Sequence, residues 1–203
     1  MIKMRAETAS IIKNLRRQTN WYVITGGPGS GKTTTVNLLK ERGYITTIEH
    51  ARHYLDTQRL KGKTVEEVRK NQLEFQLGIL DMQIERKNQI SPDVLVFLDR
   101  AIPDALAYYR FLNLPEDKKL LDLLPTVFYK KIFILDTLPL KQDYARKEDE
   151  AAQKEIHALL IEVYECLPLP IIRISVLEPD ERVDFLLKNI EKSERMVDSQ
   201  PTS

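Results

Sequence analysis

A glycine-rich segment near the amino end of the sequence constrains the fold more than any other feature. It fits the pattern G-x-x-x-x-G-K-[ST] at every fixed position, between an apolar run and a helical pattern. The glycines let backbone N–H groups close around phosphate oxygens, and the following helix directs its positive end at the same anion. The segment therefore predicts a nucleoside triphosphate site formed by Gly26, Gly27, Pro28, Gly29, Ser30, Gly31, Lys32, Thr33 and Thr34.

Two side chains of this segment have individual predicted roles. Lys32 is expected to reach the β- and γ-phosphates, and the hydroxyl of Thr33 is expected to ligate Mg²⁺. The motif is common to proteins that use ATP and proteins that use GTP, so both nucleotides stay open as ligands.

The rest of the sequence alternates short apolar runs with helical patterns. Strands are expected at 21–25, 44–48, 94–99, 131–136 and 171–176. Helices are expected at 33–42, 51–60, 64–90, 150–167 and 179–190, and two more are expected to open at Pro103 and Pro115. The strands are apolar on both sides, which indicates a parallel sheet covered on both faces. The predicted fold class is α/β, a three-layer P-loop NTPase sandwich with a five-stranded parallel sheet.

Composition limits the domain organisation and the partners. The 203 residues suit one P-loop domain at 21–192, with an N-terminal helical extension at 1–20 and a flexible tail at 193–203. A net charge of +1 gives no global field to recruit nucleic acid. One cysteine and the lack of a transmembrane-length apolar run predict a cytoplasmic protein. A basic targeting or membrane-surface helix in the first 17 residues is the alternative.

The end of the third expected strand separates the classes of protein that share the phosphate motif. A guanine-specific switch carries Asp-x-x-Gly there, but Asp99 is followed by Arg100 and no glycine, and no Asn-Lys-x-Asp occurs in the sequence. A mechanical ATPase has a glutamate in the position of Arg100, where it polarises water. Asp99 is expected to help Thr33 hold Mg²⁺, and Arg100 supplies a cation for an anionic substrate or a transferring phosphoryl group. This combination indicates a small-molecule kinase.

Two further segments carry candidate catalytic residues. Glu49 ends the second expected strand, at the edge where ligands bind in such sheets, and is a candidate proton acceptor for a substrate hydroxyl. A solvated glutamate or a partner for Arg52 is the equally supported alternative. The charged segment 142–150 resembles in position a lid, in which Arg146 closes over the phosphates. An exposed charged loop is the alternative there.

Four segments together resemble a known family. Residues 26–33, 49–52, 97–104 and 142–150 are similar to the NadR-kinase-like AAA-domain family of P-loop ATPases and kinases, over about residues 21–190. The resemblance implies a fold close to that of nucleoside and nucleotide kinases, and one member domain phosphorylates ribosylnicotinamide. Glu49 with Asp99-Arg100 is also similar to the strand-end glutamate and Glu-Arg-Ser motif of deoxynucleoside kinases, with Ala101 in place of the serine.

The predicted function is transfer of the γ-phosphoryl group of ATP or GTP to a small-molecule acceptor, with Mg²⁺. Tyr108, Tyr109, Arg110 and Phe111 are candidates for an acceptor pocket, and core packing with a solvated arginine is the favoured alternative. The apolar positions of 64–90 indicate core, with a homodimer face left open. The alternative functions are a nucleoside-triphosphate hydrolase with a regulatory or partner-binding role, and a module that binds nucleotide as a structural ligand.

Overall fold

The chain folds around a five-stranded parallel sheet with the strand order β2-β3-β1-β4-β5. The computed structural model describes residues 19–126, 128–139 and 149–198. The strands are β1 Trp21–Thr25, β2 Ile45–Thr46, β3 Val96–Asp99, β4 Lys131–Leu135 and β5 Ile171–Ile174. All neighbouring strands run parallel. The predicted α/β class and the five-stranded parallel sheet are therefore confirmed.

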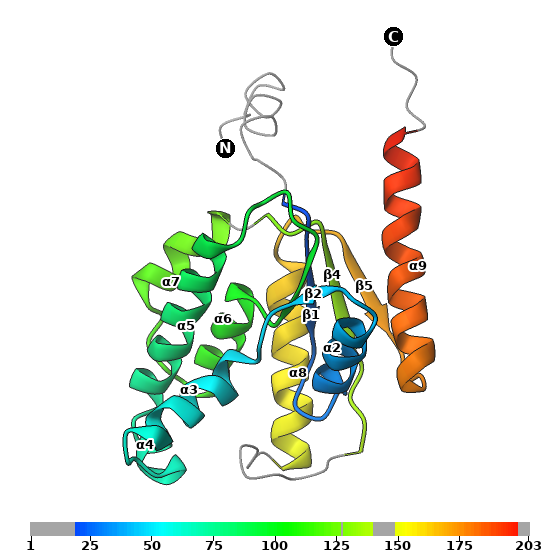
Figure 1. The fold of residues 1–203 in the computed structure, drawn as a ribbon. Coiled ribbons are helices and arrows are strands. Elements are labelled where there is room, and N and C mark those ends of the chain that lie inside the picture. Colours follow the sequence, from blue (N-terminus) through cyan, green and yellow to red (C-terminus); the bar gives the residue numbers. More distant parts are fainter. Residues whose placement is uncertain (1–18, 127, 140–148, 199–203) are drawn as a thin grey trace.

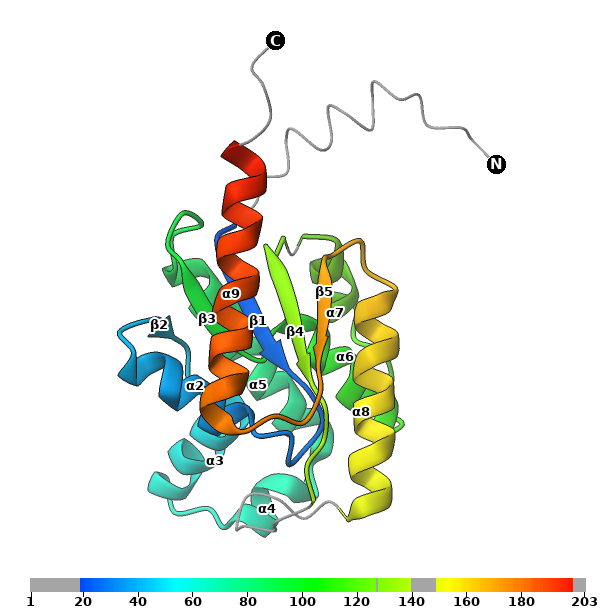
Figure 2. The same cartoon turned by 90° about the vertical axis from the view of Figure 1, so that its right-hand side faces the viewer.

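Helices cover both faces of this sheet (Figure 1). Helices α2 and α9 lie on one face, whereas α5, α6 and α8 lie on the other, and Figure 2 shows α9 and α8 on opposite sides. The helices are α2 Lys32–Glu41, α3 His50–Leu60, α4 Val65–Lys70, α5 Gln72–Gln89, α6 Ile102–Phe111, α7 Lys118–Leu123, α8 Glu150–Glu165 and α9 Pro179–Asp198, with a 3₁₀ turn η1 at Leu124–Thr126.

The central strand β1 supplies side chains to both cores. All five of its residues are buried. Trp21 and Val23 pack with α5, α6 and α8, while Tyr22 and Ile24 pack with α2 and α9, because successive side chains of a strand point to opposite faces. Each large apolar side chain that is fully buried in this way stabilises the fold by roughly 1.5–3 kcal/mol. The strand that leads into the phosphate motif is thus held rigidly from both sides.

The single helix expected at 64–90 is two helices, and that prediction was wrong. The capping box is present as expected, with Glu67 N–H donating to Thr64 Oγ1 at 3.2 Å. The first helix ends at Lys70, however, because Asn71 takes a non-helical conformation and caps a new helix. The Oδ1 atom of Asn71 accepts the Glu74 N–H at 3.1 Å. An asparagine side chain can hydrogen-bond to nearby backbone groups and so interrupt a helix. In the sequence, the apolar spacing that continues across residue 71 masked this break.

Other boundaries also differ from the expectations. Pro115 precedes α7 instead of opening it, because Asp117 caps that helix and accepts the Lys119 N–H at 2.8 Å. Strand β2 pairs over two residues only, at an edge of the sheet. Helix α9 continues to Asp198, past the expected end at residue 190. Of the expected N-terminal extension, residues 1–18 lie outside the described part of the chain, as do residues 199–203 of the expected tail.

None of the helices in the described ranges is long and apolar enough to cross a membrane.

Candidate active site

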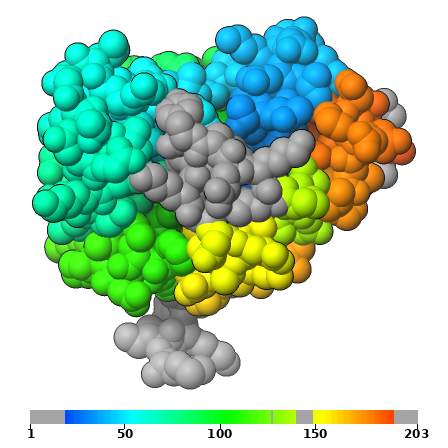
Figure 3. Space-filling view, turned by 90° about the horizontal axis from the view of Figure 1, so that it is seen from below, coloured from blue at the N-terminus to red at the C-terminus, as the bar shows by residue number. Residues whose placement is uncertain are grey.

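The predicted site residues come from the carboxyl ends of neighbouring strands. Asp99, the last residue of β3, pairs with Ile24 of β1, just before the phosphate loop begins. Thr47 follows β2 and donates its N–H to Phe97 O of β3 at 2.9 Å, which brings Glu49 to the same edge. Figure 3 views the molecule from this end, where α2, α4 and α8 all reach the surface. The parallel sheet therefore gathers residues that are far apart in the sequence.

The phosphate loop connects β1 to α2 through a backbone that only glycine adopts easily. Gly26, Gly29 and Gly31 have φ values of 145°, 72° and 78°. Gly31 is the N-cap of α2 and provides no side-chain cap, so the first-turn N–H groups have no side-chain acceptor from this residue. Such uncapped N–H groups at a positive helix end fit a phosphate.

Lys32 lies across the loop that precedes it. Its side chain is buried, and Nζ donates to Gly26 O and Gly27 O, both at 2.8 Å, and to Ser30 Oγ at 3.0 Å. Burial, reinforced by the charge of Arg100, lowers the pKa of the Lys32 ammonium to about 7. A nearby polyanion would restore the charge of this lysine, so its position fits the predicted role at the phosphates.

Asp99 is a buried carboxyl with an oxygen that lacks a hydrogen-bond partner. Its exposed fraction is 2%, and among the described residues no donor reaches Oδ1. Burial and the charge of Glu49 raise the pKa of Asp99 to about 7, against the opposing effect of Lys32. A buried carboxylate of this kind needs a cation or a donor. A hard carboxylate oxygen of this kind fits Mg²⁺.

Arg100 is held by an aspartate whose role the sequence analysis missed. Its backbone has φ 65°, in the left-handed region, and its side chain turns to Asp104 Oδ1 at 3.0 Å and to Tyr108 OH at 3.0 Å. Asp104 also accepts from Thr25 Oγ1 at 2.6 Å and from Tyr164 OH at 2.6 Å. The buried Asp104 therefore fixes Arg100 to β1 and α8. The sequence signal that could have identified Asp104 is its place in the first turn of α6.

Glu49 lies beside Arg52 and also at the wall of the pocket. Its Oε2 atom lies 3.5 Å from Nε of Arg52, so the expected ion pair is present. The carboxylate also lines the same pocket as Lys32, Arg100 and Asp104, and it retains 18% side-chain exposure. Glu49 is thus oriented by an arginine and accessible from the pocket at the same time.

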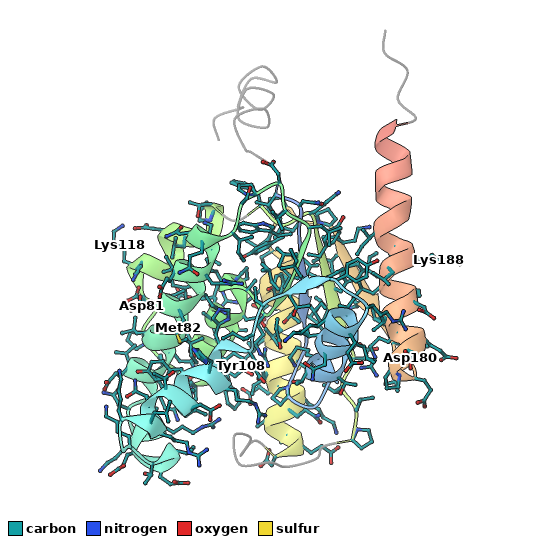
Figure 4. All side chains as sticks on the ribbon, viewed as in Figure 1. Asp81, Met82, Tyr108, Lys118, Asp180 and Lys188 are labelled. Carbon is teal, nitrogen blue, oxygen red and sulfur yellow. The ribbon has the colours of Figure 1, made fainter. Side chains whose placement is uncertain are left out.

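A pocket of about 340 Å³ adjoins the phosphate loop. Pro28 and Lys32 line it from the loop, and α3, α5 and α6 supply most of the remaining walls. Arg69 of α4 and Asp149 and Ala152 at the start of α8 complete the lining. Tyr108, labelled in Figure 4, and Phe111 line it, whereas their two neighbours take the alternative roles of core packing and surface pairing. Tyr109 is fully buried in the core and Arg110 pairs with Glu162 at 2.9 Å, because these two residues lie on other faces of α6.

The pocket walls combine apolar and polar groups. Phe75 and Ile79 of α5 belong to the apolar part, and Gln76 and Gln83 of the same helix add buried amides. Its volume lies within the range of small-molecule sites.

Arg146 lies outside the described residues, so its role as a lid cation stays a prediction from the sequence.

These features define the class of protein as a P-loop protein with a nucleotide-kinase-like fold. A family model described as an AAA domain matches residues 21–182. The chain belongs to this AAA-domain family, as the resemblance in the sequence predicted. The P-loop of this fold implies nucleotide binding. A comparison with curated proteins finds no significant match.

Solved structures support the same fold. A deoxyadenosine kinase from M. mycoides, solved with dCMP and dCDP, is similar with a TM-score of 0.58 and 13% identity, over 85% of this chain and 98% of the other. Thymidylate kinase from Candida albicans is similar with a TM-score of 0.57 and 19% identity, over 87% of this chain and 93% of the other. Thymidylate kinase from Ehrlichia chaffeensis is similar with a TM-score of 0.58 and 17% identity, over 86% of this chain and 99% of the other.

Proposed function

We propose that this chain is a Mg²⁺-dependent phosphotransferase that moves the γ-phosphoryl group of ATP or GTP to a small-molecule acceptor. The observation that carries the proposal is the pocket of about 340 Å³ that shares Lys32 with the phosphate loop and contains Glu49 and Arg100. A hydrolase needs room only for a water molecule beside the γ-phosphate. A second compartment of this size, joined to the loop, supports an acceptor other than water.

The nucleotide side of the site consists of the loop and its cation ligands. Backbone N–H groups and Lys32 bind the triphosphate, and Thr33 and Asp99 would hold Mg²⁺ directly or through water. The metal ion supplies positive charge to the triphosphate. Asp99 requires such a charge more than a surface carboxylate does, because it is 2% exposed and its Oδ1 has no donor among the described residues.

The acceptor side consists of Glu49, Arg100 and the pocket walls. Glu49 accepts the proton of the acceptor hydroxyl, and its contact with Arg52 at 3.5 Å orients the carboxylate. Arg100, fixed by Asp104 and Tyr108, adds positive charge at the loop end of the pocket. Arg146 stays a prediction from the sequence as a further cation for the transferring group.

The test begins with a screen for compounds that stimulate ADP or GDP release, with the phosphorylated product identified by mass spectrometry. The structural neighbours are named for kinases of deoxyadenosine and thymidylate, so deoxynucleosides and nucleoside monophosphates are the first compounds to screen. Product formation that needs both Mg²⁺ and a triphosphate supports the proposal.

The Glu49→Gln variant then separates transfer from hydrolysis. It removes the basic oxygen at almost unchanged size, so transfer to the acceptor should fall by ~10²–10⁴-fold while slow hydrolysis remains. Glu41→Gln, an exposed position on α2, is the matched control and should keep both activities. An equal loss of both activities in Glu49→Gln would assign Glu49 to structure or metal binding. Hydrolysis with no acceptor in a broad screen would favour the hydrolase.

A further inference from the structure

Helix α8 contacts the phosphate loop through two side chains that no part of the proposed transfer chemistry uses. Gln153 and His157 are four residues apart and therefore share one face of the helix. The amide of Gln153 is buried, and its Nε2 donates to Pro28 O at 2.7 Å and to Leu138 O at 3.0 Å. The backbone N–H of Gly27 donates to Nδ1 of His157 at 3.2 Å.

The same contact explains why residue 27 is a glycine. In the pattern G-x-x-x-x-G-K-[ST] this position is free, and Gly27 does not have a left-handed φ that would demand glycine. A Cβ at Gly27 would lie 2.9 Å from His157 Cβ and 3.1 Å from Gln153 O. The residue is small because α8 packs directly against the loop, which makes glycine here a consequence of tertiary contact.

The loop needs this support because of its composition. Three of its residues, Gly26, Gly29 and Gly31, lie at positive φ, and glycine loses more backbone freedom on ordering than any other residue. Its later half is held from elsewhere: Leu138 N–H donates to Gly29 O at 3.1 Å, and Arg182 Nη1 of α9 donates to Gly31 O at 3.3 Å. The early half is held by Lys32 Nζ, through Gly26 O and Gly27 O, and by α8, through Gly27 N–H and Pro28 O.

His157 serves as an acceptor only when it is uncharged. Burial, with Arg173 and Lys32, lowers its pKa, while Asp136 acts in the opposite direction. A neutral imidazole that accepts at Nδ1 carries its hydrogen on Nε2, and that atom lies 3.7 Å from Asp136 Oδ1. The ring is therefore suited to accept the hydrogen bond from Gly27 N–H, and this bond fixes the early end of the loop.

We propose that Gln153 and His157 are positioning residues of the phosphate site, which hold Gly27 and Pro28 in the conformation that binds the triphosphate. Neither side chain has to touch nucleotide for this role. The proposal rests on the nucleotide-binding half of the proposed function and is independent of any acceptor.

The test measures equilibrium binding of Mg²⁺–ATP to the whole chain, with unfolding by urea recorded for each variant. His157→Phe keeps a ring and removes the acceptor, and Gln153→Leu keeps much of the volume and removes the donor. Each should weaken ATP binding by about tenfold, the effect of one neutral hydrogen bond. His157→Asn offers Oδ1 near the position of Nδ1 and should restore binding to within about threefold. Lys154→Ala, at an exposed position of the same helix, is the control and should bind as wild type.

Two results would overturn the proposal. Wild-type ATP affinity in both His157→Phe and Gln153→Leu would remove the positioning role alone. Equal weakening in His157→Phe and His157→Asn, in proportion to their loss of unfolding free energy, would reduce it to ordinary packing. If the wild-type chain itself binds no triphosphate, nucleotide binding fails together with the positioning role, and this outcome is distinguishable from the first two. Failure to find an acceptor has no bearing on these measurements.

Discussion

Two buried ionisable side chains, Lys32 and Asp99, dominate the chemistry at the scale of single residues. Their pKa values are displaced in opposite directions, each toward about 7, because burial disfavours the charged form of both groups. A triphosphate favours the charged form of the lysine, and a divalent cation favours the charged form of the aspartate. The two side chains thus fit the two components of a metal–nucleotide complex, and each can be tested separately.

Lys32→Ala should abolish most triphosphate binding and leave the fold intact. The variant removes the ammonium that lies against Gly26 O and Gly27 O, and it also removes the unfavourable burial of an amine. ATP affinity, measured by titration with circular dichroism as the check on folding, should fall by a factor of a hundred or more. Lys40→Ala, an exposed lysine of the same helix, should bind normally. Unchanged affinity in a folded Lys32→Ala protein would refute the assignment of the loop.

The Mg²⁺ requirement should depend on pH through Asp99. Its pKa is raised to about 7, so the carboxyl must lose a proton before it ligates the metal, and Mg²⁺ affinity should strengthen as pH rises through that value. Below it, affinity should fall by up to about tenfold per pH unit. Mg²⁺ titrations of nucleotide binding at several pH values measure this, and Asp99→Asn corrects for protonation of the nucleotide. Parallel pH profiles for wild type and Asp99→Asn would exclude Asp99 as a ligand.

At the scale of elements, the break between α4 and α5 determines one wall of the pocket. Asn71 ends one helix and caps the next, so that α5 starts in a new direction. A small separate core contains Phe75 and Ile79 of α5, Val68 of α4 and Leu55 of α3. Phe75 and Leu55 also line the pocket, so the capping of α5 influences the acceptor side of the site.

Replacing Asn71 by alanine should destabilise the protein by about 1 kcal/mol, the usual effect of losing an N-cap. The reason is the lost acceptor for the Glu74 N–H, which Asn71 Oδ1 receives at 3.1 Å. Urea unfolding measures the change, and Lys70→Ala, one residue earlier and exposed, should stay within about 0.5 kcal/mol of wild type. A larger loss in Lys70→Ala than in Asn71→Ala would contradict the assigned cap.

At the scale of the whole molecule, the two cores on either side of the sheet share the strands that end at the site. Tyr22 and Ile24 of β1 belong to one core and Val23 to the other. The phosphate loop extends from the end of β1, and α8 and α9 contact it from opposite sides of the sheet. Nucleotide bound there is therefore expected to stabilise the domain as one unit.

Saturating Mg²⁺–ATP should raise the free energy of unfolding of the whole domain. At a concentration 100 times the Kd the increase is about 2.7 kcal/mol, because the ligand binds the folded chain alone. Thermal melting with and without nucleotide measures the shift, and Lys32→Ala should show almost none. A shift of the same size in that variant would mean that the stabilising site lies elsewhere.

The sequence by itself determined the phosphate loop, the α/β class and most of the elements. These features are local properties that a sequence pattern predicts directly: a glycine at positive φ, a buried apolar strand and a helical apolar period. It also supplied Asp99, Arg100 and Glu49 as candidates, because residues at strand ends meet at one edge of a parallel sheet. The break between α4 and α5 at Asn71 is also a local feature. In the sequence, however, the capping signal of Asn71 is weaker than the apolar period that continues across the break.

Only the tertiary structure decided which groups contact one another. It joined Asp104 to Thr25, Arg100 and Tyr164, residues spread over the chain, and it brought α8 against Gly27. It also separated Tyr108, which faces the pocket, from Tyr109, which faces the core. Contacts between distant segments depend on strand order and helix packing, and these follow from the burial of all the apolar faces at once. No local pattern in the sequence carries that information.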